Sequence, residues 1–342
     1  MNRVDYIDVA KGIGIMLVVW AHILIVGPSH QLIYAFHMPL FFFISGLLFN
    51  KSKYDGIGTF IRKRAVRLLI PYFIYSVATW TVWACFRYVR GDEVDSYWMP
   101  LLQTFIAQGS GAFIVHNSAL WFVPCLFAVE IIFYCLCCVG RVTALVSSFV
   151  IAGIGCLLAY IYGDSYLMTL PWNLDAAIYA LPFYAVAHMI REKVGLVKVQ
   201  EYIGGHKGML LVLMLLLFGV MAYMALGYGE CSMGSSSYNC QMQVFFIRAF
   251  AGCLAFVILS GMICSLWQLD KIIQAFKWCG MNSLDIMCLH IPVKGVVIIL
   301  VAKVLHTAAD ISSDALLSSV AFVITMLIVA TLILMINKFV KR

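Results

Sequence analysis

Residues 6–22 read YIDVAKGIGIMLVVWAH, an apolar stretch that carries Asp8 and Lys11 near its start and His22 at its end. Ionisable side chains inside a membrane span are costly and usually mark a functional site. Lys11 and His22 are eleven residues apart, so on a helix they lie about 20° apart around the axis and about 16 Å apart along it. We expect one helix face to carry a cation near the membrane surface and an imidazole deeper inside.

The composition of the whole chain agrees with a membrane protein. Of the 342 residues, 63% are hydrophobic and only 11% are charged, with a mean hydropathy of +0.97. Soluble domains are nearer 25% charged. The net charge of +7 does not indicate binding to nucleic acid, because the basic residues are concentrated in a few loops. The fold class expected is all-α integral membrane.

Ten apolar stretches have roughly the 20 residues that a membrane-spanning helix requires. The predicted spans are 12–28, 32–49, 68–90, 119–139, 142–162, 174–190, 208–227, 244–267, 283–305 and 315–337. Most of the 23 Lys and Arg residues fall in alternate connections, which predicts that both termini are cytoplasmic. We expect one transmembrane domain over residues 1–342, embedded in the bilayer of a bacterial inner membrane, with an external loop at 91–118.

Most of the 12 cysteines lie within the apolar spans, and two others lie in a polar loop. Cys231 and Cys240 flank a Ser/Gly-rich loop, predicted to be external, and are expected to be able to form a disulfide in an oxidising compartment. No pair of Cys-x-x-Cys motifs has the spacing of a metal site, so no bound metal is expected.

Histidines in the first two spans are the first candidates for chemistry. His22 is interpreted as a general base near neutral pH, with Asp8 and Lys11 on the same helix and His37 facing it from the second span. The alternatives are structural: His22 as a hydrogen-bonded residue of a helix bundle, and His37 as a residue of the membrane interface.

A basic cluster before the third span is the second candidate. Arg64 and Arg67 are three residues apart and share a helix face, where two guanidinium groups suit bidentate binding of phosphates. The alternative is a cluster that only sets the membrane orientation.

Further polar residues lie in later spans. Trp121 and Glu130 in the fourth span, with Asn282 and His290 near the start of the ninth, are candidates for substrate binding, although Trp121 is also typical of an interfacial anchor. Arg248 and Lys294 also lie within spans and are expected to pair with the carboxylates there, Glu130 and Asp285.

Taken in order along the chain, these motifs resemble those of the membrane acyltransferase-3 family, and most closely its fucose-acetylase-like sugar O-acetyltransferases. The resemblance rests on Asp8-x-x-Lys11-Gly12 followed by His22, on HMPLFFFISG at 37–46, on RAVRLLIPY at 64–72, on LWFVPCLF at 120–127 and on GMNSLDIMCLHIPV at 280–293. Lys11 stands where many members have arginine. The lysine keeps the positive charge but lacks the bidentate geometry of a guanidinium group.

The resemblance implies O-acetylation, by transfer of an acetyl or other acyl group from cytoplasmic acyl-CoA to a hydroxyl of a cell-surface polysaccharide or lipid-linked sugar. It implies that His22 is the essential histidine, as general base or as transient acyl carrier, and that Lys11, Arg64 and Arg67 hold the phosphates of CoA. A histidine-lined transporter and a structural membrane protein are the alternative functions. A transporter predicts inverted repeats and broken helices, which the sequence does not indicate.

Overall fold

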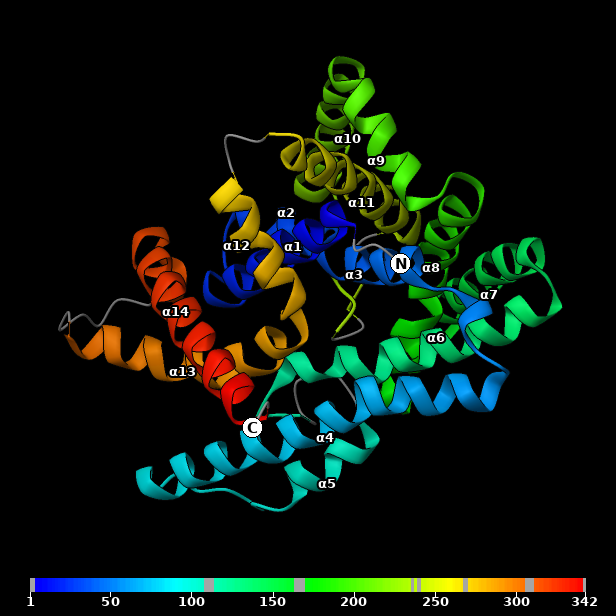
Figure 1. Ribbon diagram of the computed structural model, residues 1–342. Helices are drawn as coiled ribbons and strands as arrows, with labels where there is room; N and C mark the ends of the chain where they lie inside the picture. The colour runs from blue at the N-terminus through cyan, green and yellow to red at the C-terminus, as the bar shows by residue number, and fades with distance from the viewer. Residues whose placement is uncertain are drawn as a thin grey trace. The chain divides into compact units, whose positions relative to one another are not determined.

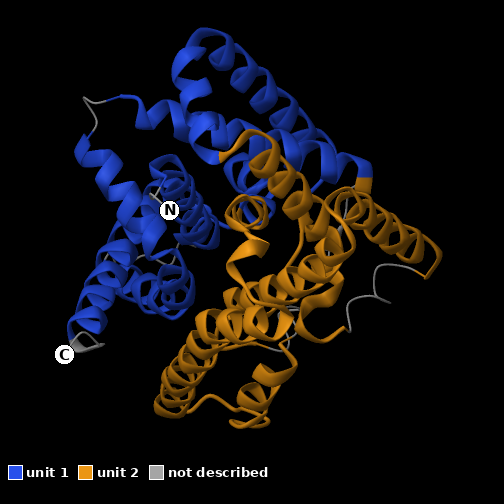
Figure 2. Cartoon of the chain, turned by 45° about the vertical axis from the view of Figure 1, so that its right-hand side comes forward, with its two compact units in different colours: residues 1–40, 196–230, 243–342 blue, residues 41–195, 231–242 orange. Residues whose placement is uncertain are grey.

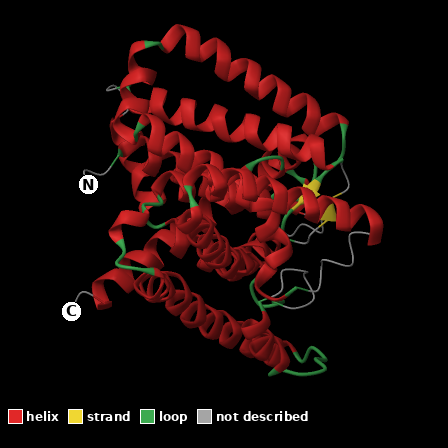
Figure 3. Cartoon of the chain, turned by 90° about the vertical axis from the view of Figure 1, so that its right-hand side faces the viewer, coloured by secondary structure: helices red, strands yellow, loops and turns green. Residues whose placement is uncertain are grey.

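The computed structural model describes residues 4–107, 114–162, 170–234, 237–238, 241–266, 270–304 and 311–340. The described chain is mainly helical and also contains one pair of two-residue strands (Figures 1 and 3). The helices are α1 Asp5–Ile23, α2 Pro28–Tyr34, α3 His37–Leu48, α4 Ile57–Arg90, α5 Met99–Ile106, α6 Phe122–Val139, α7 Arg141–Tyr162, α8 Leu174–Val194, α9 Leu196–Gly205, α10 Lys207–Gly227, α11 Met242–Cys264, α12 Asp270–Met281, α13 Ser283–Val304 and α14 Ala315–Val340. The strands are β1 Cys231–Ser232 and β2 Ser237–Tyr238.

The fold confirms an all-α integral membrane protein, whereas the count of ten spans is not confirmed. Within the described ranges, nine stretches are long and apolar enough to cross a membrane. The predicted span 174–190 is present as helix α8 but is not among the nine. Helix α8 carries Asp175, Arg191, Glu192 and Lys193 at its ends and buries much of its length, so it presents little continuous apolar surface to lipid.

The predicted second span is divided into two helices. Helix α2 ends at Tyr34, and α3 begins at His37. Pro39 lacks the N–H that would donate to the carbonyl of Ala35, so a continuous helix would lose a hydrogen bond here, whereas proline is tolerated in the first turn of a new helix. His37 therefore lies at a helix start rather than inside a helix.

The chain divides into two compact units, each described here by itself (Figure 2). Unit 1 comprises residues 1–40, 196–230 and 243–342, and unit 2 comprises residues 41–195 and 231–242. The single transmembrane domain expected from the sequence stays a prediction.

In unit 1, two glycines bring α1 and α12 into backbone contact. A Cβ on Gly12 would lie 1.9 Å from the carbonyl oxygen of Phe276, and one on Gly280 would lie 1.9 Å from the carbonyl oxygen of Asp8. No side chain fits at either position without moving the helices apart. The Lys11-Gly12 pair of the sequence motif thus combines a charged residue with a helix contact.

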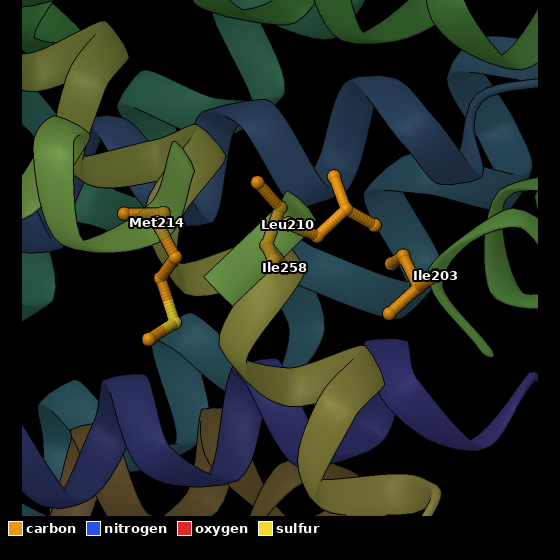
Figure 4. Close-up of a cluster of buried hydrophobic side chains, with 5 residues drawn as sticks. Ile203, Leu210, Met214 and Ile258 are labelled. Atoms are coloured by element: carbon orange, nitrogen blue, oxygen red, sulfur yellow. The ribbon is translucent and has the colours of Figure 1, made fainter. Parts of the chain in front are cut away.

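Further apolar packing in unit 1 joins α9, α10 and α11. Ile203 of α9, Leu210 and Met214 of α10, and Ala255 and Ile258 of α11 form one buried cluster (Figure 4). Arg64 and the other unit 2 candidates are held by a separate set of helices.

In unit 2, a glycine again sets a close helix contact. A Cβ on Gly46 of α3 would lie 2.2 Å from the carbonyl oxygen of Tyr184 in α8. Phe49, just after α3, makes edge-on ring contacts with Phe133 of α6 and His188 of α8. These contacts pack α3, α6 and α8 around an aromatic core.

The Ser/Gly-rich loop contributes the strand pair. Cys231 is disulfide-bonded, and the ten other described cysteines are free. Cys240 lies outside the described residues. The geometry of a Cys231–Cys240 bridge and the distance between these two residues are therefore not described. A Cβ on Gly234 would lie 2.6 Å from the indole nitrogen of Trp121, so this loop lies directly against the Trp121 ring.

Candidate functional site

Three buried or half-buried histidines of unit 1 share one hydrogen-bonding arrangement. The Nδ1 atom of His22 lies 2.8 Å from the carbonyl oxygen of Val18, that of His37 lies 2.9 Å from Ile33, and that of His290 lies 3.1 Å from Ile286. A carbonyl oxygen can only accept, so each Nδ1 carries the hydrogen and each Nε2 of a neutral ring holds the lone pair. The helices that bear these histidines therefore fix their tautomers.

The imidazoles of His22 and His290 lie together. Their ring centroids are 5.0 Å apart, which places α1 and α13 against each other at this level. His290 is fully buried and its Nε2 atom has no hydrogen-bond partner among the described residues, whereas His22 is half-buried. His22 also lies within electrostatic reach of His37, and the expectation that the two rings face one another stays a prediction.

Lys294 joins this group from α13. Its Nζ atom donates to the carbonyl oxygen of His22 at 2.6 Å. Helix α1 ends one residue later, so the carbonyl of His22 has no partner in the next turn. Lys294 supplies that missing donor and fixes the backbone of His22 against α13.

Asp8 and Lys11 form an ion pair at the other end of α1. Lys11 Nζ lies 2.8 Å from an Asp8 carboxylate oxygen, and Asp8 is buried. The helix α1 is continuous over Lys11 and His22, as predicted. The charge of Lys11 is therefore balanced by Asp8, and a phosphate would have to share or displace that partner.

In unit 2, Arg64 and Arg67 differ in their surroundings. Both guanidinium nitrogens Nε and Nη2 of Arg64 donate to the carboxylate of Glu130, whose side chain is only 1% exposed. Arg67 is exposed on the same helix, α4. Glu130 is thus paired with Arg64 and not with Arg248 or Lys294 as expected, whereas the pairing of those two cations with Asp285 stays a prediction.

Helix α4 extends beyond the predicted membrane span, which would place Arg64 and Arg67 near one membrane surface. Its 34 residues span about 51 Å, more than the ~30 Å of the hydrocarbon core. It begins 11 residues before the predicted span at 68, and those residues carry the basic cluster. The predicted start of the span at 68 would place Arg67 just outside the apolar layer.

A family model described as an acyltransferase domain matches residues 4–335. The chain belongs to the acyltransferase-3 family. This match covers both units and every candidate residue above. The resemblance inferred from the sequence motifs is confirmed.

The acyltransferase is also similar to the nodulation protein NolL of Mesorhizobium japonicum (strain LMG 29417 / CECT 9101 / MAFF 303099), with 37% identity over 97 residues. The match covers 24% of this chain and 25% of NolL, so the chain spans about a quarter of the length of that curated relative. No solved structure matches the chain.

Two of the remaining predicted residues are engaged within the acyltransferase. Trp121 is buried beneath the loop that contains Gly234, and its ring meets that of Phe122 edge-on. The side-chain amide of Asn282 donates to the carbonyl of Trp278 at 2.8 Å and joins α12 to α13. The structure brings His22, His37, His290, Asp8, Lys11 and Asn282 into unit 1 and places Arg64, Arg67, Trp121 and Glu130 in unit 2.

Sequence inspection missed a second polar group of the acyltransferase in unit 1. His30 Nδ1 lies 3.4 Å from a carboxylate oxygen of Glu230, the His30 ring stacks on Tyr34 with centroids 4.1 Å apart, and Tyr34 meets His37 at 4.8 Å. Positions 30, 34 and 37 follow the i, i+4, i+7 spacing of one helix face. That spacing was the available signal, although a break in the helix follows Tyr34.

Proposed function

We propose that the protein transfers an acetyl or other acyl group from cytoplasmic acyl-CoA to a hydroxyl of a cell-surface glycan or lipid-linked sugar, with His22 as the reacting residue. Family membership supports the acyltransferase activity. The donor, the acceptor and the role of His22 are the proposal. The observation that carries it is the fixed tautomer of His22, whose Nδ1 is bound to Val18 and whose ring is half-buried beside His290.

In the base route, Nε2 of His22 takes the proton of the acceptor hydroxyl as its oxygen attacks the thioester carbonyl carbon. The carbon–sulfur bond then breaks, and the CoA thiolate takes the proton back from the imidazolium. In the acyl-carrier route, Nε2 attacks the thioester carbonyl carbon, the carbon–sulfur bond breaks, and CoA leaves as the thiolate. The acceptor hydroxyl then takes the acyl group from the acyl-imidazolium, which restores the neutral imidazole, and the hydroxyl proton passes to the thiolate. The two routes use the same atom.

The donor side of the proposal assigns Arg67 to the phosphates of CoA. Arg67 is exposed, whereas Arg64 is already occupied by Glu130. Lys11 is the further candidate for a phosphate, provided that Asp8 gives up part of their ion pair. Acetyl-CoA acts here as the donor substrate, and the lipid bilayer surrounds the site.

The His22→Ala variant tests the chemistry. We expect normal insertion and purification with at least a 10²-fold loss of acyl transfer, as removal of a general base or nucleophile predicts. Transfer of radiolabelled acetyl from acetyl-CoA to membrane glycans measures the loss. Release of one equivalent of CoA in a rapid burst without acceptor would select the acyl-carrier route. Turnover near that of the wild type would refute the assignment of His22.

The Arg67→Ala variant tests the donor site, and Arg62→Ala is its matched control. Arg62 is also exposed on the same basic segment of α4. We expect acetyl-CoA to bind at least tenfold more weakly to the Arg67→Ala variant, because one charged contact to a phosphate contributes about 1.5–3 kcal/mol. Arg67→Lys should also weaken binding, since the fork geometry is lost. Equal losses in the Arg62 and Arg67 variants would indicate a diffuse charge effect only.

A further inference from the structure

Arg248 of α11 is a fully buried arginine with an unused edge. Its side chain is among the largest fully buried ones, at 1% exposure, and its Nη1 atom donates to the carbonyl of Gly229 at 2.7 Å. Within the part of the chain that the structure describes, its Nε and Nη2 atoms have no hydrogen-bond partner. Nε and Nη2 form the edge of a guanidinium that makes paired hydrogen bonds to two neighbouring oxygen atoms.

Such an arrangement is costly unless something occupies it. A buried polar group without a partner loses its hydration, and the penalty is larger for a charged group. The Gly229 hydrogen bond orients the guanidinium and leaves the paired edge buried and unbonded, so a ligand would have to displace the atoms that cover it. The arrangement is therefore suited to a ligand that supplies two adjacent acceptor oxygens.

The groups around Arg248 indicate the charge of that ligand. The carboxylate of Glu230 lies within electrostatic reach of Arg248 and pairs with His30 at 3.4 Å. Glu230 is partly exposed, with 35% of its side chain accessible. One guanidinium and one carboxylate leave the group without net charge, and the carboxylate at the exposed side disfavours an incoming anion.

The same groups match the chemistry of a sugar. Vicinal hydroxyls supply two adjacent oxygens for Nε and Nη2, and a third hydroxyl can donate to the carboxylate of Glu230. Tyr34, stacked on His30, adds an aromatic surface of the kind that lines small-molecule sites. All of these residues belong to unit 1.

A line of polar rings connects this group to the proposed catalytic histidine. His30 stacks on Tyr34, Tyr34 contacts His37, and His37 lies within electrostatic reach of His22. We propose that Arg248, Glu230 and His30 form a subsite that binds the neutral vicinal diol of the acceptor sugar. This inference rests on the proposed acyl transfer for its biological meaning, while the binding itself can be measured without acyl-CoA.

The test is sugar binding by the full-length protein in detergent, measured as a saturable rise of the unfolding temperature. The probes are the neutral methyl glycosides of glucose, galactose, mannose and fucose, with glucuronate and inorganic phosphate as anionic probes. We expect at least one neutral glycoside to bind and the two anions not to. Saturable binding of the anions alone would overturn the proposal. Binding of none of the probes would also overturn it and would leave ordered water as the partner of the unbonded edge of Arg248.

Variants locate the binding. Arg248→Met should abolish the sugar-induced shift, and Glu230→Gln should weaken it at least tenfold. Lys303→Met is the matched control, because Lys303 is an exposed cation of α13 in the same unit. A sugar shift that survives both Arg248→Met and Glu230→Gln would overturn the proposal.

Stability without ligand separates a binding role from a structural one. A buried charged group with unbonded polar atoms carries an uncompensated desolvation cost, so an apolar side chain of similar length should be tolerated there. A binding role therefore predicts an unchanged or higher unfolding temperature for Arg248→Met, and a clear fall would indicate a structural role instead. Sugar binding without any consumption of acetyl-CoA would reject the proposed function but not this subsite. Consumption of acetyl-CoA without sugar binding would reject this subsite but not the proposed function.

Discussion

Arg64 in unit 2 and Arg248 in unit 1 are both removed from water in large part, yet their surroundings are opposite. Arg64 uses its paired edge, Nε and Nη2, on the carboxylate of Glu130. Arg248 leaves the same edge without a partner. The first arrangement is complete without a ligand and the second is not, so burial alone does not distinguish a structural arginine from a binding one.

His116 in unit 2 and His290 in unit 1 show the same contrast between a fully hydrogen-bonded side chain and a partly bonded one. Both ring nitrogens of His116 in unit 2 have partners, the hydroxyls of Thr79 at 3.0 Å and Thr104 at 3.4 Å. His290 in unit 1 engages only Nδ1 and leaves Nε2 buried without a partner. The hydrogen bonds of His116 fix the segment after α5 to α4 and α5, whereas the free nitrogen of His290 lies beside His22.

The largest effect is expected from breaking the complete arginine pair. Glu130→Ala leaves the Arg64 guanidinium, 17% exposed, without its counter-charge, and removing one partner of a buried pair typically costs about 3–5 kcal/mol. Thermal unfolding in detergent measures the loss. The double variant Arg64→Leu/Glu130→Leu should recover most of it, because no charge is left uncompensated.

Arg67→Leu is the control for that cycle, since Arg67 lies exposed on the same helix and should change stability by less than about 0.5 kcal/mol. If Glu130→Ala cost no more than this control, Arg64 and Glu130 would behave as a surface pair and the contrast with Arg248 would disappear.

A smaller effect concerns pH and His116. Burial lowers the pKa of His116 to about 4, from a usual value of about 6.5. Between these two values the unfolded chain binds a proton that the folded chain does not, so stability is full above about pH 6.5 and falls as the pH drops towards 4. The contribution of His116 is at most about 1.4 kcal/mol per pH unit.

Unfolding temperatures of the wild type and of His116→Gln, measured from pH 7 to pH 4, isolate this contribution from that of other titrating groups. The amide of Gln keeps a donor and an acceptor for the two threonines but does not titrate. Parallel pH profiles for the two proteins would mean that His116 does not have the predicted low pKa.

The smallest effect on stability is expected at His290. His290→Phe keeps a ring beside His22, loses one hydrogen bond to Ile286 and removes a buried nitrogen without a partner, so the net change should stay within about 1 kcal/mol. Acyl transfer should nevertheless fall, because the polar neighbour of His22 is lost. A large loss of stability with unchanged specific activity would place His290 among the complete, structural groups, with His116.

Sequence alone was sufficient for the class of the fold and the family. Membrane spans follow from apolar length, because the bilayer thickness sets the number of residues. The ordered motifs from Asp8 to His290 predicted the acyltransferase family that the domain match confirms. The fixed tautomers of His22, His37 and His290 were also implicit in sequence, since each ring bonds to a carbonyl four residues earlier in its own helical segment or the one before it.

Tertiary structure decided which charges meet. Arg64 and Glu130 are 66 residues apart, Lys294 and His22 are 272 apart, and no local pattern encodes such pairs. The count of ten spans is a different case, because α8 is absent from the nine candidate spans by composition, with charged residues at both of its ends. Whether a buried group is satisfied depends on neighbours brought together by folding, so the unbonded edge of Arg248 could be identified only once its described neighbours, Gly229 and Glu230, had been placed.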